Sequence, residues 1–97
     1  MTDRKDSAKL LGILQVLADS NRLRIIGLLG EGEKSVSEIT RLLGQSQPLV
    51  SHHLKALKSG GLIAARREGP FVLYRLAGTE LPGILDSLSK LTGQGGA

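Results

Sequence analysis

Residues 45–61 read QSQPLVSHHLKALKSGG and contain both a start and a stop signal for one helix. Ser46 is a favourable N-cap residue, and Pro48 falls in the first helical turn, where a missing backbone N–H costs nothing. The Gly60–Gly61 pair provides a left-handed exit at the other end. The stretch therefore predicts a single short helix with well-defined ends.

This predicted helix has one apolar and one polar face. The apolar positions recur at i, i+4 and i+7, which are Val50, Leu54 and Leu57. On or beside the opposite face lie Pro48, Ser51, His52, Lys55 and Ser59. No acid occurs among residues 45–61, and hydroxyl, imidazole and ammonium groups are those that reach base edges and phosphates in a major groove. Taken alone, this face is equally consistent with an ordinary solvated helix surface.

The positive charge of the chain is concentrated in the same region. The 97 residues carry a formal net charge of +4, which favours a polyanionic partner. Between residues 41 and 75 the only acid is Glu68, against six basic residues: Arg41, Lys55, Lys58, Arg66, Arg67 and Arg75. Charge therefore favours a DNA contact on this helix and on the segment that follows it.

Composition limits the remaining possibilities. Phe71 and Tyr74 are the only aromatic residues, so the core must be aliphatic, and stacking on single-stranded bases is not expected. There is no cysteine, which excludes disulfides and favours a cytoplasmic setting. No apolar run reaches membrane-spanning length, and the N-terminus lacks the apolar core of a signal peptide. We expect residues 1–97 to form one soluble cytoplasmic domain with no membrane partner.

The first helix is apolar on more than one side. Residues 1–6 are charged and are expected to be frayed, and Ser7 is a suitable N-cap. The apolar positions that follow cover more than half of a helix surface: Leu10, Leu11, Ile13, Leu14, Val16, Leu17 and Ala18. One side must be buried in the domain and the other against something else, most simply a second subunit.

Two further helices lead into the opening stretch. The first is capped at Asp19–Ser20 and ends at the glycines of residues 30–32. The second begins at a capping box, Ser35 with Glu38, and ends at Gly44. Two short helices joined by a tight turn containing glycine outline a helix-turn-helix.

After residue 61 the periodicity changes from helix to strand. Residues 62–67 and 71–76 read as two strands joined by Glu68-Gly69-Pro70, a hairpin that carries three arginines. Beside a helix-turn-helix such a hairpin is a wing. A purely structural hairpin with solvated arginines is the weaker interpretation, because three arginines against one glutamate are not a balanced surface.

The last predicted helix follows Gly78–Thr79, which we expect to cap it. Its apolar stripe consists of Leu81, Ile84, Leu85, Leu88 and Leu91. This stripe is expected to pair with the first helix and with its copy in a dimer; a loosely packed helix within a monomer is the alternative. Residues 92–97 are rich in glycine and are expected to form a flexible tail.

Three segments together resemble the ArsR/SmtB family of bacterial winged helix-turn-helix repressors over nearly the full chain. They are residues 17–25, residues 46–57 and residues 61–76. The resemblance implies a mainly α fold with a small β-hairpin, in which five helices and a two-stranded wing form a winged helix-turn-helix. It also implies a homodimer joined through the first and last helices, with recognition helices in successive major grooves of double-stranded DNA. Such repressors typically release their operator when an inducer binds.

The metal-binding residues of that family are missing. Where the family places Glu-Leu-Cys-Val-Cys, this chain has Glu-Lys-Ser-Val-Ser at residues 33–37. The last helix offers Glu80 and Asp86 but no histidine, and His52 and His53 point about 100° apart on a helix, so they cannot chelate one ion. We expect no metal, no cofactor and no sensing of thiol oxidants. A small organic inducer between the end helices, a partner protein or no inducer at all remain open.

The sequence thus predicts a homodimeric, sequence-specific transcriptional repressor, and not an enzyme. No histidine stands at a suggestive spacing from a carboxylate, and there is no phosphate-binding loop. A winged-helix protein-interaction module without specific DNA binding is the alternative, but it would not explain the acid-free basic face.

The predicted site has two parts. The candidate DNA contacts are Ser46, Gln47, Pro48, Ser51, His52, Lys55, Arg66 and Arg67. Among them Gln47, Ser51 and His52 are candidates for base readout and Lys55 for a phosphate contact, whereas Pro48 offers only apolar contact. His53, at the edge of the apolar stripe, is expected to be partly buried and structural. The candidate dimer contacts are Leu10, Leu14, Leu81, Ile84, Leu85 and Leu88.

Overall fold

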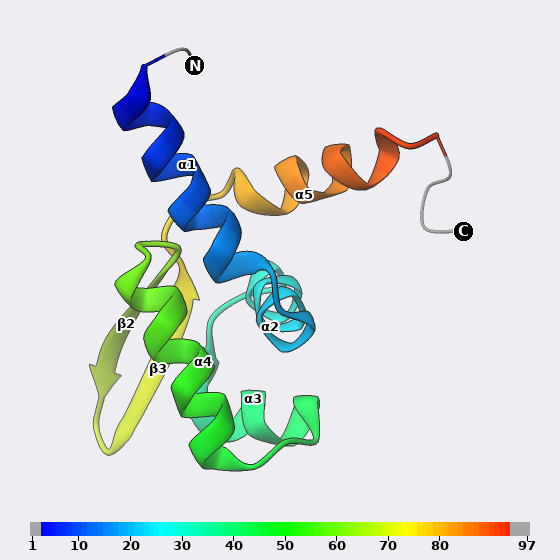
Figure 1. Ribbon diagram of the computed structural model, residues 1–97. Coiled ribbons are helices and arrows are strands. Elements are labelled where there is room, and N and C mark those ends of the chain that lie inside the picture. Colours follow the sequence, from blue (N-terminus) through cyan, green and yellow to red (C-terminus); the bar gives the residue numbers. More distant parts are fainter. Residues whose placement is uncertain (1–2, 94–97) are drawn as a thin grey trace.

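Five helices and three strands follow one another in the computed structural model, which describes residues 3–93 (Figure 1). The helices are α1 (Arg4–Leu17), α2 (Ser20–Gly30), α3 (Val36–Leu43), α4 (Gln47–Ser59) and α5 (Leu81–Lys90). The strands are β1 (Lys34–Ser35), β2 (Ile63–Glu68) and β3 (Phe71–Leu76). The predicted winged helix-turn-helix fold is confirmed, with one strand more than expected.

The helix-turn-helix is held by the caps that the sequence predicts. At the start of α3, the Glu38 N–H donates to the Ser35 Oγ over 3.2 Å, and the Ser35 N–H donates to the Glu38 carboxylate over 3.0 Å. Gly44 then ends α3 in the left-handed conformation, with φ of 67°. The Ser46 Oγ accepts from the Leu49 N–H at the start of α4. These short-range bonds fix the angle at which α4 leaves the turn.

The wing is part of a three-stranded antiparallel sheet in the order β1-β3-β2. The sequence predicted only the two strands of the wing. In the structure β1 adds a third strand, because Lys34 pairs with Tyr74 and Ser35 with Leu73. This third strand joins the start of α3 to the wing. Two residues are too few to show the alternation by which a strand is recognised in a sequence.

The core is entirely aliphatic and lies between α2, α3, α4 and the base of β2. Its buried members are Leu17, Ile25, Ile26, Leu29, Ile39, Leu43, Val50, Leu54, Leu57 and Ile63. The predicted apolar stripe of α4 accounts for three of them, each at most 1% exposed. Helix α4 is therefore anchored by its inner face, and its outer face is exposed.

Both end helices begin where the sequence did not indicate. Helix α1 starts at Arg4, because the Asp3 carboxylate accepts from the Lys5 N–H over 2.9 Å. The expectations that residues 1–6 are frayed and that Ser7 is the cap are wrong for residues 3–7, and residues 1 and 2 lie outside the described chain. Helix α5 starts at Leu81 without a side-chain cap, so Gly78–Thr79 does not cap it.

The two ends of the molecule have different characters. The start of α4 and the tip of the β2–β3 hairpin lie at the lower end of Figure 1, whereas α1 and α5 diverge at the upper end. No residue of α5 is buried, and the helix projects away from the core. Residues 91 and 92 form a turn after it, closed by the Gly93 N–H donating to the Lys90 carbonyl, and residues 94–97 of the predicted tail are outside the described range. Within residues 3–93, no helix is both long and apolar enough to cross a membrane.

Candidate nucleic-acid interface

The six candidate contacts on α4 and at its cap are all exposed. They are Ser46, Gln47, Pro48, Ser51, His52 and Lys55. Ser46 holds the start of the helix, while no hydrogen bond or ion pair within residues 3–93 engages the side chains of Gln47, Ser51 or Lys55. No internal hydrogen bond has to be broken before these donors and acceptors bind a ligand, so this surface is available for hydrogen bonding.

The N-terminal end of α4 lies within this exposed surface. Its first-turn N–H groups have no partner within the helix, and the macrodipole gives this end a partial positive charge. There is no acidic residue in the first turn to neutralise it. Lys58 adds a cation in the last turn. The whole exposed face of α4 is thus attractive to anions.

The two arginines of the wing are not equivalent. Arg66 donates from Nε to Glu33 Oε2 over 2.9 Å and from Nη2 to Glu33 Oε1 over 2.8 Å, and its Nη2 also lies 2.7 Å from Glu68 Oε2. The hydrogen bonds from Arg66 hold the pKa of Glu33 below its ordinary value, and those to Glu33 raise the pKa of Arg66. Glu33 lies outside the hairpin, just before β1. Its carboxylate therefore offsets part of the positive charge of the wing, which the sequence of the hairpin alone did not indicate.

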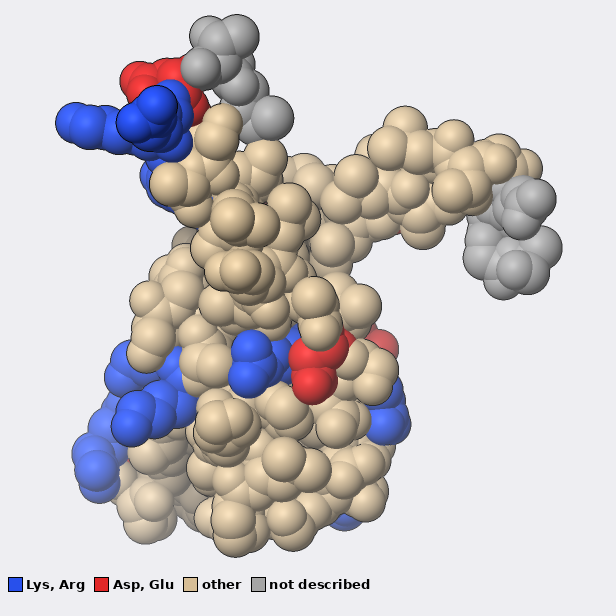
Figure 2. Space-filling model, viewed as in Figure 1, with Lys and Arg blue, Asp and Glu red and all other residues tan. Residues whose placement is uncertain are grey.

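Arg67 is exposed and makes no ion pair within the described residues. Neighbouring residues of a strand point to opposite faces, so Arg67 points away from the Arg66–Glu33 pair. Figure 2 shows Lys and Arg gathered along the side of the molecule formed by α4 and the wing. Of the two candidate wing contacts, Arg67 has the uncompensated charge and Arg66 the compensated one.

His53 lies on the opposite side of α4 from the exposed face. It is 5% exposed, as its place beside the apolar stripe predicts, and its Nδ1 accepts a hydrogen bond of 3.0 Å from Arg22 Nε. No local pattern in the sequence indicates this partner, which lies 31 residues away. The rings of His52 and His53 are 5.7 Å apart at their centroids and tilted by 59°. The two rings are not parallel, and Nδ1 of His53 is already engaged by Arg22.

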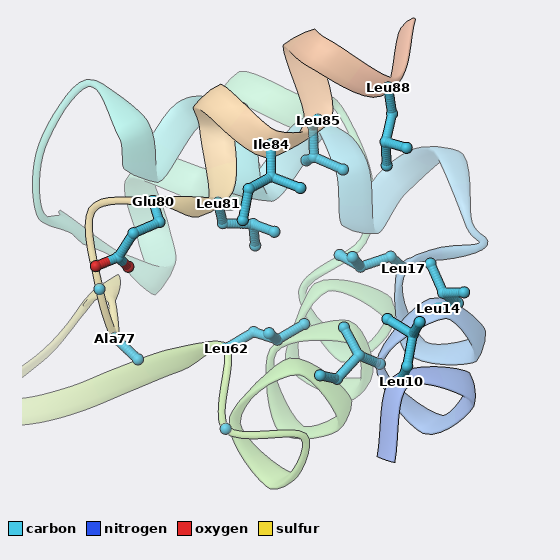
Figure 3. A pocket seen from close by; sticks show the side chains of 13 residues that line it. Leu10, Leu14, Leu17, Leu62, Ala77, Glu80, Leu81, Ile84, Leu85 and Leu88 are labelled. Carbon is cyan, nitrogen blue, oxygen red and sulfur yellow. The ribbon is translucent and has the colours of Figure 1, made fainter. Parts of the chain in front are cut away.

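The six candidate dimer contacts all line one groove. This groove, of about 510 Å³, lies between α1 and α5 and is lined by Leu10, Leu14, Leu81, Ile84, Leu85 and Leu88 among others (Figure 3). Ile84 is 52% exposed, Leu88 47% and Leu14 45%. Isolated exposed leucines are normal, but a continuous apolar groove of this kind marks an interaction site.

No group of three or more His, Cys, Asp or Glu side chains among residues 3–93 is arranged to hold a metal ion. At the start of α3, the place of the family's thiolates is taken by Ser35 and Ser37. Ser35 is engaged in the capping box with Glu38. The described side chains thus provide no converging set of ligands.

The fold, the exposed acid-free face of α4 and the apolar groove define a class: a winged helix-turn-helix domain with a basic surface at one end and an apolar groove at the other. The model of the arsR family of bacterial regulatory proteins matches residues 19–65. That range contains the helix-turn-helix and the first half of β2.

Individual relatives extend the match to most of the chain. The transcriptional activator HlyU of Vibrio cholerae is 37% identical over 87 residues, which are 90% of this chain and 81% of that protein. The arsenical resistance operon repressor of Escherichia coli is 44% identical over 66 residues, 67% of this chain and 56% of that protein. The chain belongs to the ArsR family of bacterial transcriptional regulators.

Solved structures agree with this assignment. HlyU from Vibrio cholerae superimposes with a TM-score of 0.81 at 36% identity, covering 95% of this chain and all of that one. The homodimeric winged helix-turn-helix DNA-binding domain Mb0332 from Mycobacterium bovis superimposes with a TM-score of 0.82 at 34% identity, covering 97% of this chain and 89% of that one. The matched structures therefore extend over α1 and α5 as well as over the helix-turn-helix.

Proposed function

We propose that the chain is a homodimeric repressor that binds a specific duplex DNA through α4 and the wing. The observation that carries this proposal is the exposed face of α4, where Gln47, Ser51 and Lys55 have no internal partners and no acid intervenes. Gln47, Ser51 and His52 would read base edges, because amide, hydroxyl and imidazole groups match the donors and acceptors of the major groove. Lys55 and Arg67 would hold phosphates, which position the protein on the duplex.

The second subunit supplies the other half of the recognition surface. A second copy placed in the groove between α1 and α5 would cover Leu14, Ile84 and Leu88, which the monomer leaves about half exposed. The solved relative Mb0332 is homodimeric, which supports a homodimer here as well. A symmetric dimer would present two α4 helices to half-sites about one helical turn, or roughly 34–36 Å, apart.

Repression is the simplest consequence of such binding, because a dimer on a promoter excludes polymerase. Among the relatives, one is named an activator and another a repressor, so both directions of regulation occur in the family. A footprint on the DNA that flanks this protein's own gene, combined with transcription in its presence, tests the direction. Higher transcription with the protein bound would contradict repression.

The proposal includes the absence of a metal or thiol signal. A transition-metal site needs three or four converging nitrogen, sulfur or carboxylate ligands, which residues 3–93 do not supply. Operator affinity should therefore be unchanged by zinc, arsenite, peroxide or a chelator. A reversible tenfold loss of affinity with any of them would reveal a site that forms only between subunits.

Selection of duplexes from a random library by the wild-type protein tests DNA binding itself. We expect a palindromic consensus whose affinity falls steeply with salt, since binding releases counterions from each phosphate contacted. If no consensus emerges and affinity is low and independent of salt, the chain is instead a protein-interaction module built on the same fold.

A further inference from the structure

We infer that Arg22 and His53 are positioning residues that couple the end helix α1 to the recognition helix α4. Resting on the proposed function, this inference assigns a role to a buried imidazole and a half-buried guanidinium that are not among the candidate DNA or dimer contacts. His53 is adjacent to the base-reading candidate His52 on one side and to the core residue Leu54 on the other. Any movement of His53 is therefore a movement of the recognition surface.

One guanidinium connects three helices. Arg22, on α2, donates from Nε to His53 Nδ1 on α4 over 3.0 Å and from Nη1 to the Val16 carbonyl of α1 over 3.2 Å. The carbonyls of the last helical turn have no partners within their own helix, so the bond from Arg22 Nη1 also provides a partner for one free carbonyl at the end of α1. A planar group with donors at fixed angles holds both helices in one mutual orientation.

Asp19 completes the arrangement at the junction of α1 and α2. Its Oδ1 accepts from the Arg22 N–H over 3.1 Å, and this backbone hydrogen bond lowers the pKa of Asp19. The same oxygen lies 3.9 Å from His53 Nε2. This separation is longer than a hydrogen bond, so the carboxylate lies beside the ring without binding it directly. Asp19 therefore orients Arg22, and the hydrogen bond from Arg22 Nε orients the His53 ring.

The coupling matters because α1 and α4 work at different interfaces. Helix α1 lines the groove proposed to join the subunits, and α4 carries the proposed base contacts. Two recognition helices reach successive half-sites only if each is held rigidly to the dimer interface. Apolar packing of Leu54 and Leu57 fixes the depth of α4 but is not directional, whereas hydrogen bonds depend on angle.

The substitutions for the test separate the hydrogen bond from burial and charge. His53→Leu fills the site without an acceptor, while His53→Asn keeps an acceptor near the position of Nδ1. Arg22→Lys keeps the positive charge but removes the Nε donor. Arg22 is on a partly exposed surface, so Arg22→Lys remains informative even if His53→Leu fails to fold, which circular dichroism would detect.

The first measurement compares affinity for the selected duplex with affinity for random duplex. We expect His53→Leu and Arg22→Lys each to lower this ratio about tenfold, the double variant to lose no more than either alone, and His53→Asn to restore the ratio. Affinity for random duplex should stay unchanged. An unchanged ratio in both single variants, or losses that simply add, would overturn the inference.

The second measurement needs no DNA. The chain has no cysteine, so a pair of cysteines introduced at exposed Gln15 of α1 and Ser51 of α4 can be spin-labelled selectively, with labelled chains diluted into unlabelled ones. Pulsed electron paramagnetic resonance should give a narrow distance distribution in the parent protein and His53→Asn, and a broader one in His53→Leu and Arg22→Lys. Equal widths in all of them would overturn the coupling. If the distance distribution broadens in these variants but the library selection yields no preferred duplex, the proposed function is contradicted and the coupling is still supported.

Discussion

At the scale of single residues, the exposed face of α4 and the wing separate into groups that would identify bases and groups that would only attract DNA. Gln47 and Ser51 are short or planar polar side chains on the first two turns of α4, where a recognition helix meets base edges. Lys55 and Arg67 have long charged side chains, which suit phosphates. The two groups should therefore respond differently to substitution.

We expect alanine at Gln47, Ser51 or His52 to cost about 1–3 kcal/mol of binding free energy on the selected duplex and little on random DNA. The reason is that a side chain that reads a base contributes only where the correct base is present. Fluorescence anisotropy titrations at one fixed salt concentration measure both affinities. Equal losses on the two duplexes would make the residue a positioning contact.

The wing arginines provide a matched pair. Arg67→Ala should reduce the slope of log K against log salt by about 0.9, the value expected when one neutralised phosphate is released. Arg66→Ala should change the slope much less, because Glu33 and Glu68 already neutralise its guanidinium. Equal effects of the two substitutions would mean that Arg66 exchanges its carboxylates for phosphate on binding.

At the scale of elements, the caps fix how α3 and α4 meet. Glu38 accepts from the Ser35 N–H, and this bond lowers the pKa of Glu38 below its ordinary 4.5. A carboxyl group whose pKa is lowered by folding adds stability that is present above its unfolded pKa and is lost as the pH falls through the folded value. The stability that the capping box gives to the helix-turn-helix is therefore lost at acidic pH.

We expect the free energy of unfolding to fall as the pH drops below 4.5, and Glu38→Gln to flatten this part of the curve. Glutamine can make the same cap but does not titrate. Urea unfolding at a series of pH values measures the change. Glu80→Gln, at a helix start without a side-chain cap, is the control and should keep the parent slope. A parent slope in Glu38→Gln would exclude the cap as a cause.

Local rules identified the elements well, and distant partners account for what they missed. The caps at Ser35 and Ser46 and the stripe of α4 depend on residues within a few positions, so they can be predicted from the sequence. The pairing of Ser35 with Leu73, of Arg66 with Glu33 and of Arg22 with His53 joins residues more than thirty positions apart. Such pairings form only when the chain is folded, and they are what separates Arg66 from Arg67.

At the scale of the whole molecule, the apolar groove and the basic surface would act together. Leu88→Glu places a charge in the groove between α1 and α5, where burial against a second subunit would be costly. We expect the dimer to dissociate and operator binding to disappear together, because one half-site alone binds weakly. Analytical ultracentrifugation and anisotropy measure the two effects on the same sample.

The control for Leu88→Glu is Leu23→Glu, since Leu23 is 42% exposed and does not line the groove. It should leave both the dimer and the DNA affinity intact. A Leu88→Glu protein that sediments as an unchanged dimer would show that α5 does not join the subunits.

The spacing of half-sites tests the central claim most directly, because only a rigid dimer that reads two successive major grooves depends on it. The selected duplex is compared with one in which about 5 base pairs, or half a helical turn, are inserted between the half-sites. We predict that this insertion reduces affinity to the level of random DNA, and that an insertion of about 10 base pairs does the same, because it moves the half-sites roughly 34 Å further apart than two fixed recognition helices can span. Equal affinity for all three duplexes would contradict binding by a dimer with two fixed recognition helices.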